Sequence, residues 1–313
     1  MSENSRLVRD VSVQIIHHDL WVSDDIFNCH PPVDSRVELG KGLWIGPLGH
    51  ETIEDIFNAC SPQGLNFKPT RQFFSRYCFV REQNVTSVPS LNWDDDRQLQ
   101  DCIALSRLVH PTTISTYYSA RLSYDAGKSD RPSMIVPGPT HGIGAFAWVN
   151  GADWRDWLTG NEAQELARLV AIYDFDSMPD RVRRAMRQFE SACLTYYPDA
   201  RLTLAVTGLE ALVNTYLYQA TAKFQARIAS ISKEVGLTVS ENCARKAYEY
   251  RSSLVHGQGL DGQSIDQEFS EIYEIVETLL RKLVRKCIED SSFSKCFESK
   301  ESIDAYFQNL VSS

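Results

Sequence analysis

Short apolar runs separated by Pro, Gly and polar residues fill the chain up to about residue 150. Runs such as GKGLWIGPLG and STYYSARLSY have the β-branched and aromatic content of strands. TIEDIFNAC and DRQLQDCIALSRLV follow helical spacing, and Asp94, Asp95 and Asp96 stand where the second helix would begin. PSMIVPGPTHGIG is typical of a loop and precedes one last predicted strand, AFAWV. The pattern predicts an α+β domain over residues 1–158.

The pattern changes near residue 160, where apolar residues begin to recur at steps of three and four. We expect a helix near 180–197, which Pro198 and Asp199 end. The next helix, ARLTLAVTGLEALVNTYLY, is apolar around most of its circumference, which predicts a central place in a helical bundle. Its single polar stripe consists of Thr203, Thr207, Glu210 and Asn214.

Further helices complete an all-α antiparallel bundle, which we expect to occupy residues 159–313. The third helix of this bundle ends at Gly236, a residue suited to a left-handed C-cap. Thr238 and Glu241 suit a capping box that opens the fourth helix, and Gly257 closes it. A fifth, long helix and a short amphipathic helix, SIDAYFQNL, follow. The apolar seam of the fifth helix is Phe269, Ile272, Val276, Leu279 and Leu283.

The chain of 313 residues has a net charge of −9, which disfavours a protein that coats nucleic acid through bulk electrostatics. Residues 1–178 carry 15 basic and 23 acidic side chains, a net of −8, whereas residues 179–313 carry 17 and 18, a net of −1. The predicted bundle is therefore the half that repels an RNA backbone less. RNA binding there needs a narrow substrate or a locally basic cleft.

Composition is ordinary for a globular protein, with 43% apolar and 23% charged residues. No segment approaches the ~20 uncharged apolar residues that cross a bilayer, and MSENSRLVRDVSV lacks the apolar core of a secretory signal. We therefore expect a cytoplasmic protein with no membrane partner. The eight cysteines include no C-x-x-C pair, which favours reduced, mostly buried thiols. His17-His18 and Cys29-His30 lack a second pair at ligand spacing, and GKGLWIGPLG lacks the G-K-[ST] of a phosphate loop, so we expect no metal and no cofactor.

One segment of the predicted bundle combines residue types that can carry chemistry: Arg251-Ser252-Ser253-Leu254-Val255-His256-Gly257. An arginine, a small polar residue, three further residues and a histidine fit the R-polar-x-x-x-H signature of HEPN domains. Upstream, LTLAVTGLEALVN resembles the LE-A-L helix of the ApeA-like HEPN family. The segments RVRRAMRQFESACLTYYPDARL and KFQARIASI, and the Y-x-x-R-S-x-L-V-H-G ending, also resemble that family. The resemblance covers roughly residues 178–290.

The resemblance implies an HEPN-type bundle that acts as a metal-independent endoribonuclease, cleaving RNA by attack of the 2′-OH. Arg251 and His256 are then the catalytic pair, with Ser252 and Glu210 in support. Such proteins are often bacterial anti-phage or toxin-type effectors of abortive infection. The expected partners are RNA, a second copy of the chain, and an antitoxin or phage-derived trigger. The N-terminal domain would sense the trigger or restrain the nuclease.

The residue types suit this chemistry. Histidine, with a pKa near ~6.5, takes or gives protons near neutral pH, and the planar fork of arginine binds two phosphate oxygens. Ser252 would bond a phosphate oxygen or hold His256 in one tautomer. Five residues of regular helix separate two side chains by ~140°, so Arg251 and His256 face one point only if the helix ends or distorts. In HEPN nucleases two motifs meet across a two-fold dimer, and the resemblance implies the same arrangement here.

Each of these residues also has a structural interpretation. A histidine before a glycine at a helix end complements the helix dipole, which would account for His256. Arg251 would simply pair with an acid, Glu210 being one candidate, and Glu210 would be a solvated position on its stripe. The bundle as a whole would then be a non-catalytic HEPN module that dimerises or binds a partner. A second basic cluster would track RNA phosphates or complement the dipole of its own helix: Arg281, Lys282, Arg285 and Lys286.

Overall fold

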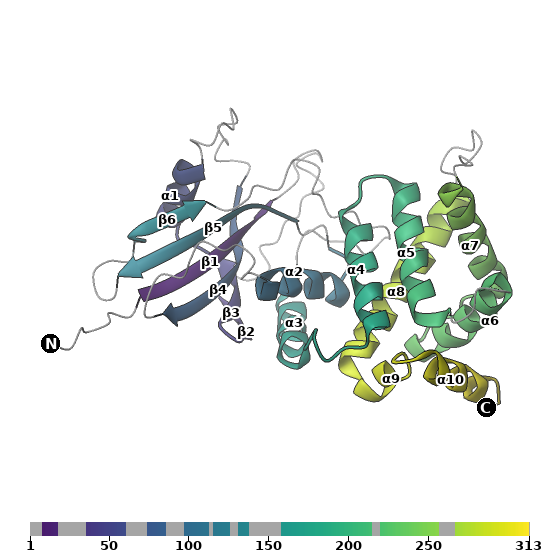
Figure 1. The fold of residues 1–313 in the computed structure, drawn as a ribbon. Helices are drawn as coiled ribbons and strands as arrows, with labels where there is room; N and C mark the ends of the chain where they lie inside the picture. The colour runs from purple at the N-terminus through teal and green to yellow at the C-terminus, as the bar shows by residue number, and fades with distance from the viewer. Residues whose placement is uncertain are drawn as a thin grey trace. The chain divides into compact units, whose positions relative to one another are not determined.

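The chain divides into two compact units, which a computed structural model shows as a β-rich unit and a helical one (Figure 1). The first comprises residues 1–147 and 155–171, and the second comprises residues 148–154 and 172–313. An α+β region followed by helices is therefore confirmed. The structure describes residues 8–17, 36–60, 74–85, 97–112, 115–125, 131–137, 158–214, 220–256 and 267–312.

An antiparallel sheet with strand order β2-β3-β4-β1-β5-β6 forms the first unit (Figure 1). Strand β1 pairs on one side with β4 and on the other with β5, so segments far apart in the sequence meet at the centre of the sheet. The strands are β1 (Val8–His17), β2 (Val37–Gly40), β3 (Leu43–Pro47), β4 (Phe74–Val85), β5 (Ser115–Asp125) and β6 (Met134–Pro137).

Residues on both faces of the sheet are buried where β3 pairs with β4. Trp44 lies opposite Val80 and Ile45 lies opposite Phe79, and all four side chains are buried. Because successive strand residues point to opposite faces, this part of the sheet is covered on both sides. The apolar runs of the N-terminal half are therefore explained by core packing.

The predicted segment GKGLWIGPLG forms the tight hairpin between β2 and β3. Gly42 has a φ of +74°, and a Cβ at this position would lie 2.5 Å from the carbonyl oxygen of Glu82. That oxygen belongs to β4, whose Glu82 N–H donates to the carbonyl of Gly42 at 2.8 Å. The glycine is needed because its conformation and the close approach of β4 both exclude a side chain.

Strand β6 corrects one expectation, because it lies inside the segment predicted as a loop. It pairs with β5 from Met134 opposite Ser123 to Pro137 opposite Ala120. The proline stands at the end of the strand, where the sheet tolerates a residue without an N–H. Proline content was thus a misleading signal for this segment. The predicted strand AFAWV and the predicted helix start at Asp94, Asp95 and Asp96 lie outside the described residues.

The boundary between the two units also differs from the expected one, which lay between residues 158 and 159. Helix α3 (Gly160–Ile172) belongs with the first unit up to Ala171. It begins with a capping box, in which the Thr159 N–H donates to Glu162 Oε2 at 2.6 Å and the Glu162 N–H donates to Thr159 Oγ1 at 3.3 Å. Glu162 also contacts His110 Nδ1 at 3.1 Å. His110 directly follows α2 (Arg97–Val109), so this contact joins α3 to the end of α2 in the first unit. The other helix among the described residues of that unit is α1 (His50–Cys60).

The second unit is helical, and its main helices lie where the apolar spacing predicts them (Figure 1). Gly236 has a φ of +68° and caps the 3-10 turn Lys233–Val235, which confirms the predicted left-handed cap. All five residues of the predicted seam in the long helix are buried. The helices are α4 (Asp180–Leu194), α5 (Pro198–Val213), α6 (Ala220–Ser232), α7 (Glu241–Val255), α8 (Gln267–Glu289), α9 (Ser291–Lys295) and α10 (Lys300–Ser312).

Helix α5 is the centre of this unit, as its apolar circumference predicts. It packs against α4, α6, α7 and α8. A Cβ at Gly208 would lie 2.7 Å from Leu280 Cδ2 in α8 and 3.2 Å from Gln188 Cβ in α4. The small residue therefore lets three helices approach closely.

The start of α7 differs from the predicted capping box at Thr238 and Glu241. The N-cap is Ser240, whose Oγ accepts the N–H of Cys243 at 3.1 Å. Val239 is buried, and its N–H donates to Ser232 Oγ at 3.2 Å. These contacts anchor the segment before Ser240 and delay the start of the helix.

Candidate functional site

Arg251 lies near the C-terminal end of α7 and makes an ion pair with α5. Its Nη2 is 3.1 Å from Oε2 of Glu210, and the two side chains are 26% and 15% exposed. Glu210 comes from the last turn of α5, so the ion pair joins two helices. The structure thus brings the expected catalytic arginine into contact with the expected supporting glutamate.

Glu210 is the centre of a half-buried polar network. Asn214 Nδ2 donates to Glu210 Oε1 at 3.2 Å. The hydroxyl of Tyr248 also hydrogen-bonds Glu210, and Thr221 of α6 hydrogen-bonds Tyr248. The Arg251 guanidinium lies over the Tyr248 ring, with Cζ 6.0 Å from the centroid. Three helices, α5, α6 and α7, therefore contribute to the setting of Arg251.

Two buried atoms of this network have no hydrogen-bond partner among the described residues. They are Nε of Arg251 and Oδ1 of Asn214. A buried polar atom without a partner costs about 1–3 kcal/mol, so such atoms are few in folded proteins. Within the described part of the chain, these two atoms therefore have hydrogen-bonding capacity beside Glu210 that no other described residue uses.

The polar stripe of α5 divides into two halves with different partners. Thr203 Oγ1 donates to the carbonyl of Asp199 at 3.0 Å, and Thr207 Oγ1 donates to the carbonyl of Thr203 at 2.7 Å. These hydroxyls are satisfied within their own helix. Only the second half, Glu210 and Asn214, takes part in the network with α7.

Sequence reasoning missed Tyr248. It stands three residues before Arg251 in α7, a spacing that places two side chains on the same helix face. That spacing was the available signal. Tyr248 also packs on Phe224 of α6, with ring centroids 5.2 Å apart, so the tyrosine connects the network to the apolar core.

Two arginines hold the C-terminal end of α5, where Glu210 and Asn214 lie. Arg181 Nη1 of α4 donates to the carbonyls of Ala211 and Asn214, both at 2.9 Å. Arg227 Nη1 of α6 donates to the carbonyl of Val213 at 2.6 Å. These bonds satisfy carbonyls that a helix end leaves open and place positive charge at its negative pole. The position of the network is thereby held by α4 and α6.

Burial sets the proton affinity of this network. It raises the pKa of Glu210 above its ordinary value, although the positive charge of Arg251 and the bonds from Tyr248 and Asn214 oppose the rise. Burial also raises the pKa of Tyr248, and the nearby charge of Glu210 adds to this. Glu210 is therefore closer to its protonation equilibrium at neutral pH than a glutamate in open solvent.

His256 is the C-cap of α7 and is exposed. Its N–H donates to the carbonyl of Ser252 at 3.1 Å. Its φ of −86° stays near the helical value, whereas its ψ of 8° leaves the helical region. Because ψ changes only the path of the following chain, the His256 side chain still leaves α7 about 140° around the axis from Arg251.

The structure therefore brings some of the expected site residues together and leaves others apart. Arg251 contacts Glu210, but no contact joins Arg251 to His256 within the described part of the chain. Ser252 is half-buried and supplies its carbonyl to His256. No contact joins the Ser252 hydroxyl to His256 among the described residues. Gly257, which was expected to close the helix, lies outside the described residues.

The basic run of α8 is engaged in structural contacts, which favours its structural interpretation. Lys286 reaches the 3-10 turn after α6, where its Nζ lies 2.9 Å from Glu234 Oε2. Lys282 Nζ donates to the carbonyl of Val235 in the same turn, at 3.5 Å. The other two pair within α8, Arg281 with Glu277 at 3.5 Å and Arg285 with Glu289 at 2.9 Å.

The remaining candidates from the N-terminal half contribute little to a site. His18, Cys29 and His30 lie outside the described residues, as does the side chain of His17. Among the described residues, no group of three or more His, Cys, Asp and Glu could hold a metal ion. The described cysteines are free thiols, and most are buried, as expected: Cys78, Cys102, Cys193 and Cys287 are buried, and Cys243 and Cys296 are half-buried.

In comparisons with protein-family models, with curated proteins and with solved structures, the chain matches none of them. No helix in the described part of the chain is both long and apolar enough to cross a membrane. A functional interpretation therefore depends on the residues at the end of α7 and on the contacts that hold them.

Proposed function

We propose that this protein is a metal-independent endoribonuclease of the HEPN type, in which Arg251 and His256 act on the scissile phosphate. The observation that carries the proposal is the end of α7. There an arginine is held by Glu210 in a half-buried network, and an exposed histidine follows five residues later. An accessible imidazole can carry out the proton transfers of RNA cleavage without a metal, and a positioned guanidinium can stabilise the charge on the phosphate.

The 2′-OH of RNA is the nucleophile in the proposed reaction. A bond forms between the 2′-oxygen and phosphorus while the bond from phosphorus to the 5′-oxygen breaks, which leaves a 2′,3′-cyclic phosphate and a 5′-OH. His256 side chains remove the proton from the 2′-OH and deliver one to the 5′-oxygen. Arg251 stabilises the negative charge that builds on the phosphate oxygens. Glu210 engages one guanidinium nitrogen and leaves other N–H donors for this task.

The proposed active form is a homodimer. Arg251 and His256 leave α7 about 140° apart, so one chain does not direct both at one phosphate. Two copies related by a two-fold axis can place Arg251 of one chain beside His256 of its partner. Light scattering on the purified protein should then give twice the 35.5 kDa of one chain.

The test is cleavage of RNA by the purified protein in EDTA. We expect 2′,3′-cyclic phosphate ends, and a loss of at least about 100-fold in rate for both His256→Ala and Arg251→Ala. Arg245→Ala is a matched control, because Arg245 is also an arginine of α7 paired with a glutamate. Equal cleavage by the wild type and the His256→Ala variant would contradict the proposal.

A non-catalytic HEPN module that dimerises or binds a partner is the second candidate. The ion pair between Arg251 and Glu210 favours it, because joining α5 to α7 gives the arginine a structural role. Expression in bacteria separates the two candidates. A toxic nuclease loses its toxicity in His256→Ala, whereas a binding module keeps its behaviour because His256 is exposed at the helix end.

The proposed biological setting is a bacterial anti-phage or toxin-type effector. In that setting the α+β unit senses a phage-derived trigger or restrains the nuclease, and an antitoxin is a further proposed partner. Expression of the helical unit with and without the α+β unit tests restraint: toxicity should rise when the first unit is removed.

A further inference from the structure

Helix α4 presents a continuous exposed stripe that the proposed catalytic reaction does not use. Its exposed positions recur at steps of three and four and lead into the turn before α5. We call this surface the α4 face, and it consists of Arg184, Arg187, Ser191, Leu194, Tyr196 and Tyr197.

The arginines of the α4 face are not engaged in the way that neighbouring arginines are. Arg181 caps α5, and Arg183 pairs with Asp180. Arg184 is exposed and has no hydrogen bond or ion pair among the described residues. Arg187 is also exposed, and its guanidinium lies over the ring of Phe175 at 5.3 Å, a contact that orients it without neutralising its charge. The charges of Arg184 and Arg187 help to lower the pKa of Asp180, the partner of Arg183, but neither forms an ion pair with it among the described residues. Two positive charges on adjacent turns therefore remain available to a ligand.

The far end of the α4 face is aromatic. Tyr196 and Tyr197 are 59% and 67% exposed, and their rings meet edge to face with centroids 5.4 Å apart. Tyr197 precedes Pro198, which holds it in an extended conformation. Large exposed aromatic rings next to an exposed leucine, Leu194, mark a surface suited to a partner.

The near end of the α4 face is one helical turn from Arg181, which holds the end of α5 that carries Glu210. Arg184 is one turn from Arg181, whose guanidinium bonds the carbonyl of Asn214. Asn214 in turn donates to Glu210, the partner of Arg251. The two exposed arginines therefore extend positive charge along α4 from the end of α5 that carries the candidate site.

We propose that the α4 face binds single-stranded RNA, with phosphates on Arg184 and Arg187 and bases stacked on Tyr196 and Tyr197. The proposal names the substrate class of the proposed nuclease and rests on that function. The charge of α4 supports the proposal. This helix carries four arginines and only two acidic residues, Asp180 and Glu190, whereas the whole chain has a net charge of −9. Arginines followed by exposed rings match the backbone and the unpaired bases of a single strand, whereas the bases of a duplex are not free to stack.

The test measures binding in the full-length His256→Ala protein, so that the RNA stays intact. A fluorescent single-stranded RNA of about 12 nucleotides is titrated at several salt concentrations, beside the same sequence as a duplex. Arg184→Ala combined with Arg187→Ala should reduce the slope of log affinity against log salt by about 1.4, since each phosphate contact on a single strand contributes ~0.7. Tyr196→Ala combined with Tyr197→Ala should weaken binding about tenfold or more and leave that slope unchanged.

The matched control is Arg285→Ala combined with Lys286→Ala in α8. It removes the same charge from residues already paired with Glu289 and Glu234, and it should leave the salt slope unchanged. Thermal melts establish that each variant is folded. A slope that falls equally in the control, or that does not fall in the α4 variant, overturns the proposal. So does loss of the dimer in the tyrosine variant, because the α4 face would then contact a second copy.

Failure of this proposal and failure of the proposed function give different results. If the wild type does not cleave RNA but the α4 variants lose binding, the nuclease is refuted and the RNA surface stands. If the wild type cleaves RNA and the α4 variants bind it normally, the α4 face is refuted and the nuclease stands.

Discussion

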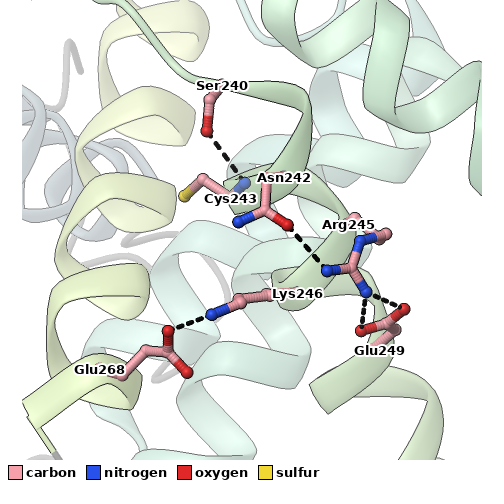
Figure 2. A network of polar contacts seen from close by, with 7 residues as sticks. All are labelled: Ser240, Asn242, Cys243, Arg245, Lys246, Glu249 and Glu268. Atoms are coloured by element: carbon pink, nitrogen blue, oxygen red, sulfur yellow. Dashed lines mark hydrogen bonds and ion pairs between the residues drawn. The ribbon is translucent and has the colours of Figure 1, made fainter.

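The two ends of α7 carry similar residues in opposite situations. At its start the charged side chains are paired with close neighbours (Figure 2). Arg245 contacts Glu249 at 2.6 Å and Asn242 at 2.7 Å, and Lys246 pairs with Glu268 of α8. At its end Arg251 reaches across to α5 and keeps a buried Nε without a hydrogen bond among the described residues. Among the described residues, the polar groups at the start of α7 are paired with each other, whereas Arg251 near its end keeps an N–H donor that none of them uses.

The difference suggests a division of labour within one helix. Short-range pairs on the surface stabilise a helix only slightly, and losing one leaves the fold and any active site intact. A half-buried arginine held by residues from other helices has a defined direction. Substitutions at the two ends should therefore separate effects on stability from effects on activity.

Among the substitutions that compare the two ends of α7, Arg251→Lys should have the largest effect. Lysine keeps the positive charge but lacks the planar fork that binds two phosphate oxygens, so the rate of RNA cleavage should fall by at least about tenfold. Arg245→Lys, at the other end of the same helix, should leave the rate unchanged. Equal rates for Arg251→Lys and the wild type would show that only charge is needed at this position.

Ser240→Ala should have the next largest effect, and on stability alone. The Ser240 hydroxyl accepts the N–H of Cys243 and opens α7, so its loss should lower the free energy of unfolding by about 1 kcal/mol. Cleavage by the folded protein should stay at the wild-type rate. Urea titration followed by circular dichroism measures the first quantity, and initial rates with excess RNA measure the second. A Ser240→Ala protein with normal stability would show that the N-cap is dispensable.

Glu210→Gln should change how stability depends on pH. Burial raises the pKa of Glu210 in the folded state, so its contribution to stability is fully present below the unfolded pKa and is lost as pH rises through the folded pKa. The quantity to follow is the difference in free energy of unfolding between the wild type and Glu210→Gln. This difference should fall as the pH rises from the ordinary glutamate pKa to the raised pKa of Glu210 in the folded protein. Glu249→Gln removes an exposed carboxylate of α7 and serves as the control. A rising difference would mean that the pairing with Arg251 outweighs burial.

The smallest effect is expected from Arg245→Ala. Its partner Glu249 is an exposed neighbour one turn away, with side chains 41% and 53% exposed. Such a pair contributes below about 0.5 kcal/mol, and salt weakens it further. Denaturant titrations should give a small difference from wild type at low salt and a smaller one at high salt. A loss well above this size would mean that the start of α7 is more than a set of independent surface pairs.

Local sequence patterns predicted much of the fold. The helical spacing placed α4, α5, α7 and α8, because each buries one face and that face repeats within the helix itself. The seam of α8 and the left-handed Gly236 are likewise properties of a few consecutive residues. Errors arose where a long-range partner decided the outcome. Pro137 ends a strand because β5 pairs with it, and the start of α7 moved to Ser240 because Val239 is anchored to Ser232.

The candidate site shows the same division. Residue types alone singled out Arg251, Ser252, His256 and Glu210, because their chemistry and spacing are visible in the chain. Only the tertiary structure placed Glu210 on Arg251 and added Tyr248 to their network.

Tertiary contacts also decided which basic residues are available. The run in α8 is the denser one in the sequence, yet it contacts Glu234, Val235 and its own glutamates. Arg184 and Arg187 of α4 remain exposed. The sequence by itself determined where helices form and which residues could act, since both depend on neighbours along the chain. The tertiary structure decided which charges meet, which are buried and which face solvent. These outcomes depend on the packing of helices that are distant in sequence.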